Sequence, residues 1–487
     1  MTKLNAAALD KIDIPTPSYD RTALKGGILH FGVGNFHRAH QAVYLDRLLE
    51  TGKGGDYAIV GAGVMPGDVK MRDTLAEQDY LYTVVEQTAE AADARVIGPM
   101  IDYIAPGNAD AVIARLADAE TKIASLTITE GGYFIDANTN HFDPTHHAIA
   151  HDGANPESPE TVFGMLVAGL KARREAGHPP FTVMSCDNIP HNGVVAREAV
   201  VETARLSSSE LADWIEENVA FPNGMVDRIT PATSERERKM VRDEFGIEDD
   251  APVFCEDFIQ WVLEDNFPAG RPALEEVGVE FVEDVTPWEY MKLRILNGGH
   301  AVIAYPAGLM DIEYVHEGMQ NDLVARFLEK IETEEMIPAV PPVPGTDTTA
   351  YFEKVKERCA NPKIADTIRR LCLDGSNRQP KFIIPTIADR LKDGKSVDGL
   401  ALESALWCRY CAGTTESGAE IAPNDPNWDR LTETAKAAKD DPSKWLEMSD
   451  IYGATGRDPA FAEPFARWLN MLWADGTEAT LRHYLGS

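Results

Sequence analysis

Residues 28–41 read Ile28-Leu29-His30-Phe31-Gly32-Val33-Gly34-Asn35-Phe36-His37-Arg38-Ala39-His40-Gln41. The apolar run predicts a buried strand, and the Gly-x-Gly turn that follows it leads into a helix. In such a turn Gly32 permits a sharp bend, and Gly34 allows the pyrophosphate of a dinucleotide to approach the main chain. His37 stands where the usual pattern has a third glycine. By itself the motif is weak evidence for a dinucleotide site, and its place after the first buried strand strengthens it.

An acidic residue that holds the ribose of such a cofactor is expected after the second strand. Asp68, in the segment 61–68, is the nearest carboxylate of this kind. The alternative is an ordinary solvated aspartate in a turn, and the sequence favours neither. If Asp68 does bind the ribose, its charge disfavours a 2′-phosphate and indicates NAD over NADP.

The first part of the chain alternates strand-like and helix-like segments, which is typical of βαβ units and a mainly parallel sheet. The predicted strands are residues 27–32, 57–61, 80–86, 123–129 and 181–185. The predicted helices between them include residues 39–49, 108–119 and 161–175. The fold class is therefore α/β, with a Rossmann-type N-terminal domain.

From about residue 288 onward long helical periodicities replace the alternation. We expect a dinucleotide-binding Rossmann-type domain over residues 1–285 and a mostly helical substrate and catalytic domain over residues 286–487. The cleft between two such domains is the default place for a ligand.

Composition excludes several classes of protein. The 487 residues carry a net charge of −33, which repels nucleic acids and anionic membrane surfaces, so neither is an expected partner. Six cysteines, no secretory signal pattern and no apolar run of about 18 residues predict a cytoplasmic protein. Cys408 and Cys411 have a CxxC spacing but no second ligand pair, so packed thiols are expected.

No metal site is expected either. The four histidines of residues 141–151 (His141, His146, His147 and His151) lie in a loop-like stretch with no cysteine or paired carboxylate at ligand spacing.

Lys292, Asn297 and His300 are separated by five and three residues. On an α-helix they would share one face, within about 140° of arc and about 12 Å of rise. A buried lysine could then deprotonate an alcohol, an amide could stabilise the alkoxide, and an imidazole could hold a neighbouring oxygen. Glu289, one turn earlier, could tune the lysine or pass its proton to water. Spacing alone favours an exposed lysine, a capping asparagine and a core histidine, because these residues recur on helices by chance.

Two further segments combine polar residues with strand ends. Residues 184–193, which include Asp187 and Asn188, follow a predicted strand at the edge where α/β sheets bind ligands. Residues 221–231 hold Val226 and Asp227 between prolines. Either segment could also be a turn whose side chains bond their own backbone.

Five segments together resemble the polyol-specific long-chain dehydrogenases/reductases: residues 31–41, 125–133, 181–188, 225–231 and 292–300. The last fits the Lys-x4-Asn-x2-His signature of that family. The resemblance covers essentially the whole chain. It implies a metal-independent, NAD(P)-linked oxidation of a sugar alcohol to a ketose, with D-mannitol and D-fructose as the expected pair and NAD as the expected cofactor. D-arabinitol and D-sorbitol are further expected substrates, and the protein would be a monomer or a small homo-oligomer.

The resemblance also implies residue roles. Lys292 would be the general base, Asn188 and Asn297 would stabilise the alkoxide, and His300 would complete the catalytic set. Substrate contacts would come from Val226, Asp227, His300, Arg370 and Arg378. Cofactor contacts would come from Gly32, Gly34, Asn35, Phe36, His37, Arg38, Asp68, Thr129, Glu130 and Asn188.

Two positions depart from the family pattern. Close relatives have a lysine where this chain has Arg378, and a guanidinium is not equivalent to an ammonium. Relatives also have two carboxylates where this chain has Gly67 and Asp68, so discrimination against NADP is expected to be weaker.

Three alternatives remain open. A reductase of fructuronate or tagaturonate from the same family would use the two arginines to neutralise a substrate carboxylate. A zinc-dependent polyol dehydrogenase would need a ligand set that the sequence lacks. A non-catalytic sugar- or nucleotide-binding regulator would keep the fold without the Lys-Asn-His set.

Overall fold

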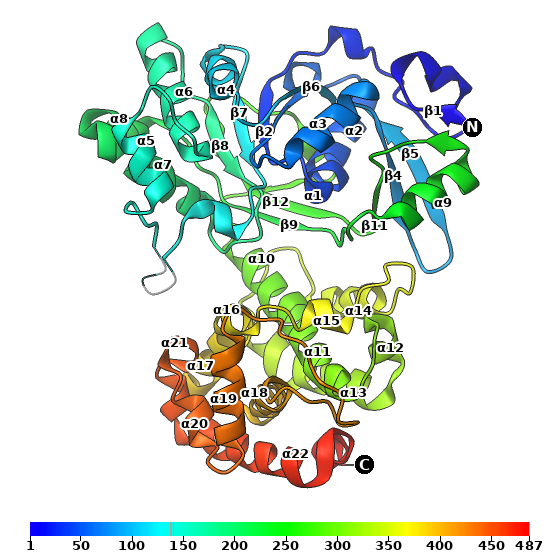
Figure 1. Ribbon diagram of the computed structural model, residues 1–487, viewed down its shortest axis with the longest axis vertical. Coiled ribbons are helices and arrows are strands. Elements are labelled where there is room, and N and C mark those ends of the chain that lie inside the picture. Colours follow the sequence, from blue (N-terminus) through cyan, green and yellow to red (C-terminus); the bar gives the residue numbers. More distant parts are fainter. Residues whose placement is uncertain (137–138, 140, 487) are drawn as a thin grey trace. The chain divides into compact units, whose positions relative to one another are not determined.

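The computed structural model describes residues 1–136, 139 and 141–486, and the chain divides into two compact units, Met1–Val285 and Thr286–Ser487. The first unit is built on a five-stranded parallel sheet with the order β6-β3-β2-β7-β8 (Figure 1). Its strands are β2 (Ile28–Phe31), β3 (Ile59–Ala62), β6 (Met100–Ile104), β7 (Ile123–Leu126) and β8 (Thr182–Ser185). This is the order of a Rossmann fold, with the first strand at the centre.

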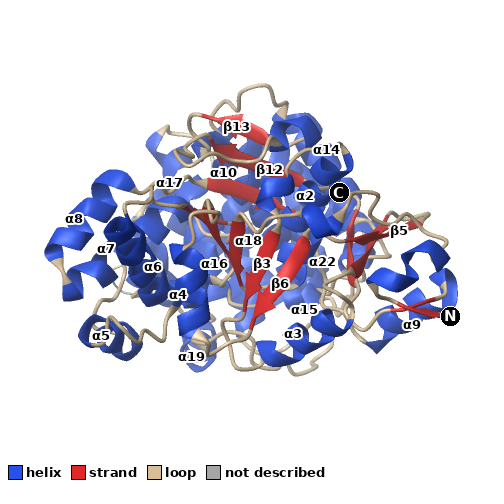
Figure 2. Cartoon of the chain, turned by 90° about the horizontal axis from the view of Figure 1, so that it is seen from above, coloured by secondary structure: helices blue, strands red, loops and turns tan. Residues whose placement is uncertain are grey.

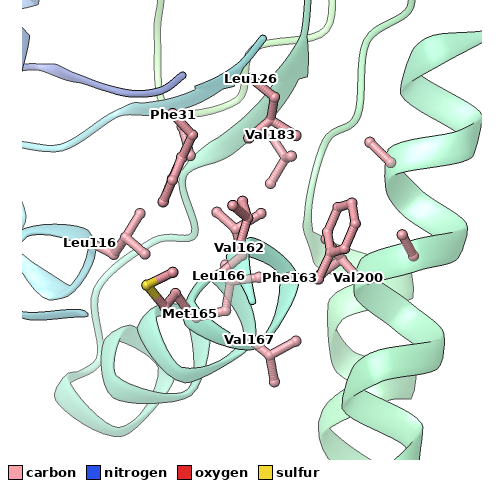
Figure 3. Packing of buried hydrophobic residues seen from close by; sticks show 14 of the residues in the cluster. Phe31, Leu116, Leu126, Val162, Phe163, Met165, Leu166, Val167, Val183 and Val200 are labelled. Atoms are coloured by element: carbon pink, nitrogen blue, oxygen red, sulfur yellow. The ribbon is translucent and has the colours of Figure 1, made fainter. Parts of the chain in front are cut away.

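Apolar residues cover both faces of this sheet, as the continuous apolar runs predict. On one face, Phe31, Leu126 and Val183 pack against α6 (Val162–Ala176), and Val200 comes from α7 (Asn192–Ser207) (Figure 3). Residues of opposite parity, such as Ile28 and Met184, pack on the other face with a separate cluster. The period of two along each strand thus fixes the register of the sheet between two helical layers.

Helices join and flank these strands in the first unit. They are α1 (Asn35–Ala39), α2 (Gln41–Glu50), α3 (Asp68–Glu77), α4 (Ala109–Ala117), α5 (His147–Ala154), α8 (Ser209–Asn218) and α9 (Glu235–Phe245), besides α6 and α7. The helix predicted over residues 39–49 corresponds to α2, and the backbone of His40 (φ −121°, ψ −86°) separates it from α1, which ends at Ala39. His147 and His151 lie in α5, so the loop predicted for them was wrong.

The third predicted strand was assigned to the wrong sheet. Residues 80–86 form most of β4 (Tyr82–Gln87), which pairs with β5 (Ala92–Ile97) and β11 (Val253–Glu256) in a separate three-stranded sheet. Figure 2 shows β3 and β6 side by side, with β5 apart from them. The missed strand β6 follows Gly98 and Pro99 and contains Asp102, which together weaken its strand signal.

Two smaller sheets complete the first unit. β12 (Gln260–Glu264) pairs antiparallel with β9 (Gly224–Asp227) and parallel with β13 (Glu280–Val282). β1 (Thr2–Lys3) pairs with β10 (Ile247–Glu248).

The second unit is helical around α18 (Asp398–Cys411), in which every residue after the first is buried. The longer helices around it are α11 (Gly299–Leu309), α13 (Asp322–Ile331), α14 (Thr348–Cys359), α16 (Gly375–Phe382), α17 (Ile384–Lys392), α19 (Trp428–Ala438) and α22 (Pro459–Leu485). The shorter ones are α10 (Thr286–Met291), α12 (Val315–Gln320), α15 (Ile368–Leu371), α20 (Ser443–Leu446) and α21 (Ser449–Tyr452). Two π-helical segments, Lys292–Gly298 and Glu332–Met336, interrupt this pattern.

Cys408 and Cys411 are buried free thiols on α18, which confirms the prediction of packed cysteines. Burial raises the pKa of both thiols well above the ordinary value, so neither is activated. No helix in the described part of the chain is long and apolar enough to cross a membrane.

Candidate active site

The turn after β2 lies where the strand order of the sheet reverses, since β3 pairs on one side of β2 and β7 on the other. Gly32 has φ +88°, and a Cβ atom there would lie 2.1 Å from the carbonyl oxygen of Thr127. The Thr127 hydroxyl donates to the Gly32 carbonyl at 2.6 Å. Only glycine fits this close approach. Because the strand order reverses here, the turn lies at the topological switch point at which dinucleotide-binding folds hold their ligand.

Gly34 is exposed and caps α1, and a Cβ atom there would meet nothing closer than the Gly32 carbonyl at 4.0 Å. The backbone is therefore uncovered on this side. The first amides of a helix have no partner within it, so the amides of Asn35, Phe36 and His37 can serve an anionic group that approaches over Gly34. The residues present fit the pyrophosphate of a dinucleotide.

The side chains of His37 and Arg38, in contrast, point into the protein. The His37 ring stacks on His30 with ring centres 3.3 Å apart. Arg38 donates to the carbonyl of Ala251 and to the side chain of Asn35, and lies 5.2 Å from the centre of the Tyr82 ring. Both side chains are 1% exposed. The role predicted for these residues can therefore involve only their backbone.

Asp68 is the first residue of α3, and its Oδ2 accepts hydrogen bonds from the amides of Val64 (2.8 Å) and Met65 (2.9 Å). The structure thus shows the turn-forming contacts of the alternative interpretation. Both bonds fall on one carboxylate oxygen, so a ribose contact would fall to Oδ1. Ribose binding by Asp68 stays a prediction.

Two strand ends beside this turn carry the other predicted residues of the first unit. Thr129 and Glu130 are exposed after β7, and Asn188 is exposed after β8. Thr129 has φ 61° and ψ 167°, a backbone conformation that is rare outside glycine. The buried carboxylate of Asp187 bonds the Thr129 amide at 2.8 Å. Sequence reasoning included Asp187 in a polar segment but gave it no role.

Val226 and Asp227 end strand β9 and are 3% and 4% exposed. The next residue, Arg228, donates to the carbonyls of Ala39 (2.7 Å) and Glu256 (2.8 Å). Because Ala39 ends α1, this arginine ties the end of β9 to the helix that follows the glycine turn. The burial of Asp227 excludes a solvated turn, and its contact with a substrate stays a prediction.

In the second unit, Lys292 and Asn297 lie in the π-helical segment Lys292–Gly298, and His300 lies at the start of α11. The angular estimate for a regular α-helix was therefore wrong here. In a π-helix the hydrogen bonds join residues five apart, so Lys292 and Asn297 fall one turn apart on the same face. π-Helical turns are rare and occur frequently at functional sites.

The burial of this segment excludes the exposed lysine of the alternative interpretation. Lys292 is 8% exposed, and Glu289, on the preceding turn of α10, is 6% exposed. The amide nitrogen Nδ2 of Asn297 is buried and has no hydrogen-bond partner among the described residues. A buried donor without an acceptor destabilises the folded protein. Such a donor is therefore expected at a site where a bound ligand supplies the acceptor.

Arg370 and Arg378 come close together, on α15 and α16. The Arg378 guanidinium donates to the backbone carbonyls of Arg370 (3.4 Å) and Leu371 (3.2 Å). Arg370 forms a two-bond ion pair with Asp366. The second unit therefore presents a paired basic patch, although part of its charge is compensated.

The sequence matches two family models, "Mannitol dehydrogenase Rossmann domain" over residues 26–276 and "Mannitol dehydrogenase C-terminal domain" over residues 284–473. The chain belongs to the mannitol dehydrogenase family. It is 56% identical to the mannitol 2-dehydrogenase of Cereibacter sphaeroides over 97% of this chain and 99% of that one. It is 43% identical to that of Aspergillus fumigatus over 99% of both chains.

Two solved structures of polyol dehydrogenases resemble the chain over its length. The ternary complex of Pseudomonas fluorescens mannitol 2-dehydrogenase with NAD and D-mannitol matches with a TM-score of 0.90 at 43% identity, covering 100% of both chains. Substrate-free D-sorbitol dehydrogenase matches with a TM-score of 0.91 at 37% identity, covering 98% of this chain and 100% of the other. The family resemblance and the fold class predicted from the sequence are both confirmed.

Proposed function

We propose that the protein is an NAD-dependent polyol dehydrogenase that oxidises D-mannitol to D-fructose. The observation that carries this proposal is its 56% identity, over nearly the full length of both chains, to a mannitol 2-dehydrogenase. A relative of 43% identity forms a complex with NAD and D-mannitol. The Rossmann sheet, the Gly32 turn and the uncovered backbone at Gly34 fit a dinucleotide.

Bound NAD would supply the acceptor for the hydride that leaves C2 of the polyol. The amine Nζ of Lys292 takes the proton of the C2 hydroxyl, and the burial of this lysine supports its role as the base. The amides of Asn188 and Asn297 donate to the developing alkoxide, as preorganised donors do in oxyanion holes. The unpaired Nδ2 of Asn297 supports this role.

The remaining predicted residues bind and orient the polyol. We assign contacts with its hydroxyl groups to Val226, Asp227, His300, Arg370 and Arg378. Glu289 lies one turn before the base and would carry its proton toward water. The amides after Gly34, with Thr129 and Glu130, would hold the cofactor, and Asp68 would favour NAD.

We further propose that the protein acts in the cytoplasm as a monomer or a small homo-oligomer. Its six cysteines are free thiols, which is typical of a reducing compartment. The basic pair Arg370 and Arg378 supports one alternative function, the reduction of fructuronate or tagaturonate, because two guanidinium groups can bind a substrate carboxylate.

Steady-state kinetics on a panel of substrates tests the proposal. D-Mannitol, D-arabinitol and D-sorbitol are oxidised, and D-fructose, fructuronate and tagaturonate are reduced, with NAD(H) and NADP(H) compared for each. The highest kcat/KM is expected for the mannitol and fructose pair with NAD(H). A higher value for either hexuronate, or no turnover of any polyol, would contradict the assignment.

A further inference from the structure

The carboxylate of Asp187 joins the ends of two neighbouring strands of the Rossmann sheet. Its Oδ1 accepts a hydrogen bond from the Thr129 amide at 2.8 Å, and its Oδ2 accepts one from the Ile128 amide at 3.0 Å. Asp187 follows β8, and the two amides follow β7. The carboxylate therefore closes the edge at which parallel sheets bind their ligands.

A tyrosine makes a second connection at the same point. The hydroxyl of Tyr133, which is fully buried, donates to Oδ2 of Asp187 at 2.8 Å and lies 2.6 Å from the hydroxyl of Ser185. Burial raises the pKa of Asp187 to about 6, with three hydrogen bonds acting in the opposite direction. An ionised carboxylate in so buried a place has a high desolvation cost, so stability alone does not explain its presence.

The main chain of Asp187 is also held. Its carbonyl accepts hydrogen bonds from the Ile189 amide (2.9 Å) and from the side chain of Asn192 (3.1 Å). Asn192 in turn bonds both backbone groups of Gly224, at the start of β9. Asn188 lies between Asp187 and Ile189, so these bonds help to fix the backbone of Asn188.

The loop on the other side of the carboxylate is strained. Thr129 has φ 61° and ψ 167°, a conformation that persists in residues other than glycine only when surrounding contacts enforce it. Thr129 is exposed, and the contact that fixes its amide is the bond to Asp187. Strain of this kind is concentrated at functional sites.

We propose that Asp187 is a positioning residue that sets Thr129 for the cofactor and Asn188 for the alkoxide. The inference rests on the proposed function, because the roles of Thr129 and Asn188 belong to it. Asp187 itself touches neither substrate nor cofactor in this assignment. It acts by holding one cofactor residue and one catalytic residue in a fixed relation.

Asp187→Asn tests the proposal, because an amide can replace one carboxylate oxygen but presents N–H groups at the other. The Thr129 or the Ile128 amide then loses its acceptor. We expect kcat for mannitol to fall about 100-fold, because residue 187 loses part of its anchor on the end of β7 and the adjacent Asn188 moves with it. The NAD dissociation constant should rise about tenfold, because the Thr129 loop relaxes. The KM for mannitol should change by less than about threefold.

Tyr133→Phe is the matched control. It removes a buried hydrogen bond from the same carboxylate but leaves the bond to the Thr129 amide in place. Its kcat and NAD affinity should stay within about threefold of wild type, while its thermal stability falls. Equal losses of kcat in the two variants, or wild-type kinetics in Asp187→Asn, would overturn the positioning role.

Amide hydrogen exchange on the wild-type protein gives a second measurement if Asp187→Asn does not fold. The amides of Ile128 and Thr129 should exchange more slowly than that of Glu130, and NAD should slow them further. Rapid exchange of both amides with NAD bound would overturn the proposal. Turnover of mannitol by the wild type, measured first, separates a failure of this inference from a failure of the proposed function.

Discussion

Arg370 and Asp366 form a two-bond ion pair in which the Nε and Nη2 atoms of the guanidinium each bond one carboxylate oxygen. The Asp366 side chain is 12% exposed, so the carboxylate of this ion pair is largely shielded from water. Asp374 adds a second opposing charge near Arg378. Part of the charge of the two arginines is therefore compensated, and we expect such a pair to suit a neutral polyol better than a hexuronate.

Asp366→Asn should shift the substrate preference. With the acid neutralised, the Arg370 guanidinium becomes available to a carboxylate of the substrate. The ratio of kcat/KM for tagaturonate to that for fructose should rise on the order of tenfold, which corresponds to a gain of about 1.4 kcal/mol from the new charge interaction. Asp322→Asn is the control, because Asp322 forms the same type of i,i+4 pair with Arg326. A ratio that responds equally in both variants would refute the explanation.

Lys292→Ala should abolish the chemical step and spare the cofactor. Because the variant has no base at this position, kcat for mannitol should fall by about 10³-fold or more, while the NAD dissociation constant changes little. Lys292 is buried, so the variant leaves room for a small primary amine. Added methylamine should restore part of the activity. Near wild-type turnover in Lys292→Ala would remove the lysine from the mechanism.

Much of the first unit could be predicted from residues 28–41, because a buried strand followed by Gly32 and Gly34 specifies both the central strand and its turn. The neighbours of that strand could not all be predicted. Residues 80–86 have the composition of a core strand, but they form a hairpin with β5, and their other partner, β11, lies far away in the chain. Local pattern does not determine which sheet a strand joins.

At the candidate site, too, the sequence could predict some features and not others. The set Lys292, Asn297 and His300 was visible from spacing, whereas the π-helical turn that places the first two on one face was not. Helix propensity scales measure the preference of each residue for the α-helix. They do not predict where a turn with i→i+5 hydrogen bonds replaces an α-helical one, because tertiary packing determines its position. Asp187 likewise could not be distinguished from a turn residue, because its role depends on amides 58 and 59 residues away in sequence.

Chelation should leave the activity intact. In the described ranges, 1–136, 139 and 141–486, no group of three or more His, Cys, Asp or Glu residues is arranged to hold a metal ion. A lysine base needs no metal to accept the hydroxyl proton. Prolonged dialysis against EDTA, followed by assay in metal-free buffer, should change kcat by less than about twofold. A loss of activity that zinc restores would contradict the proposed mechanism.

Glu403 should make the protein less stable as the pH rises. This residue is fully buried on α18, accepts a hydrogen bond from Gln379 at 2.6 Å, and has its pKa raised to about 8 by burial. The folded state therefore keeps the proton up to about pH 8, whereas the unfolded chain releases it near the ordinary value of 4.5. Between these values the free energy of unfolding should fall by up to about 1.4 kcal/mol per pH unit.

Glu403→Gln keeps an acceptor for Gln379 and cannot ionise, so its melting temperature should fall less than that of wild type between pH 6 and pH 8. Glu478→Gln, at an exposed ion pair with Arg482, should keep the wild-type slope. Equal slopes in wild type and Glu403→Gln would show that this carboxyl does not titrate on unfolding.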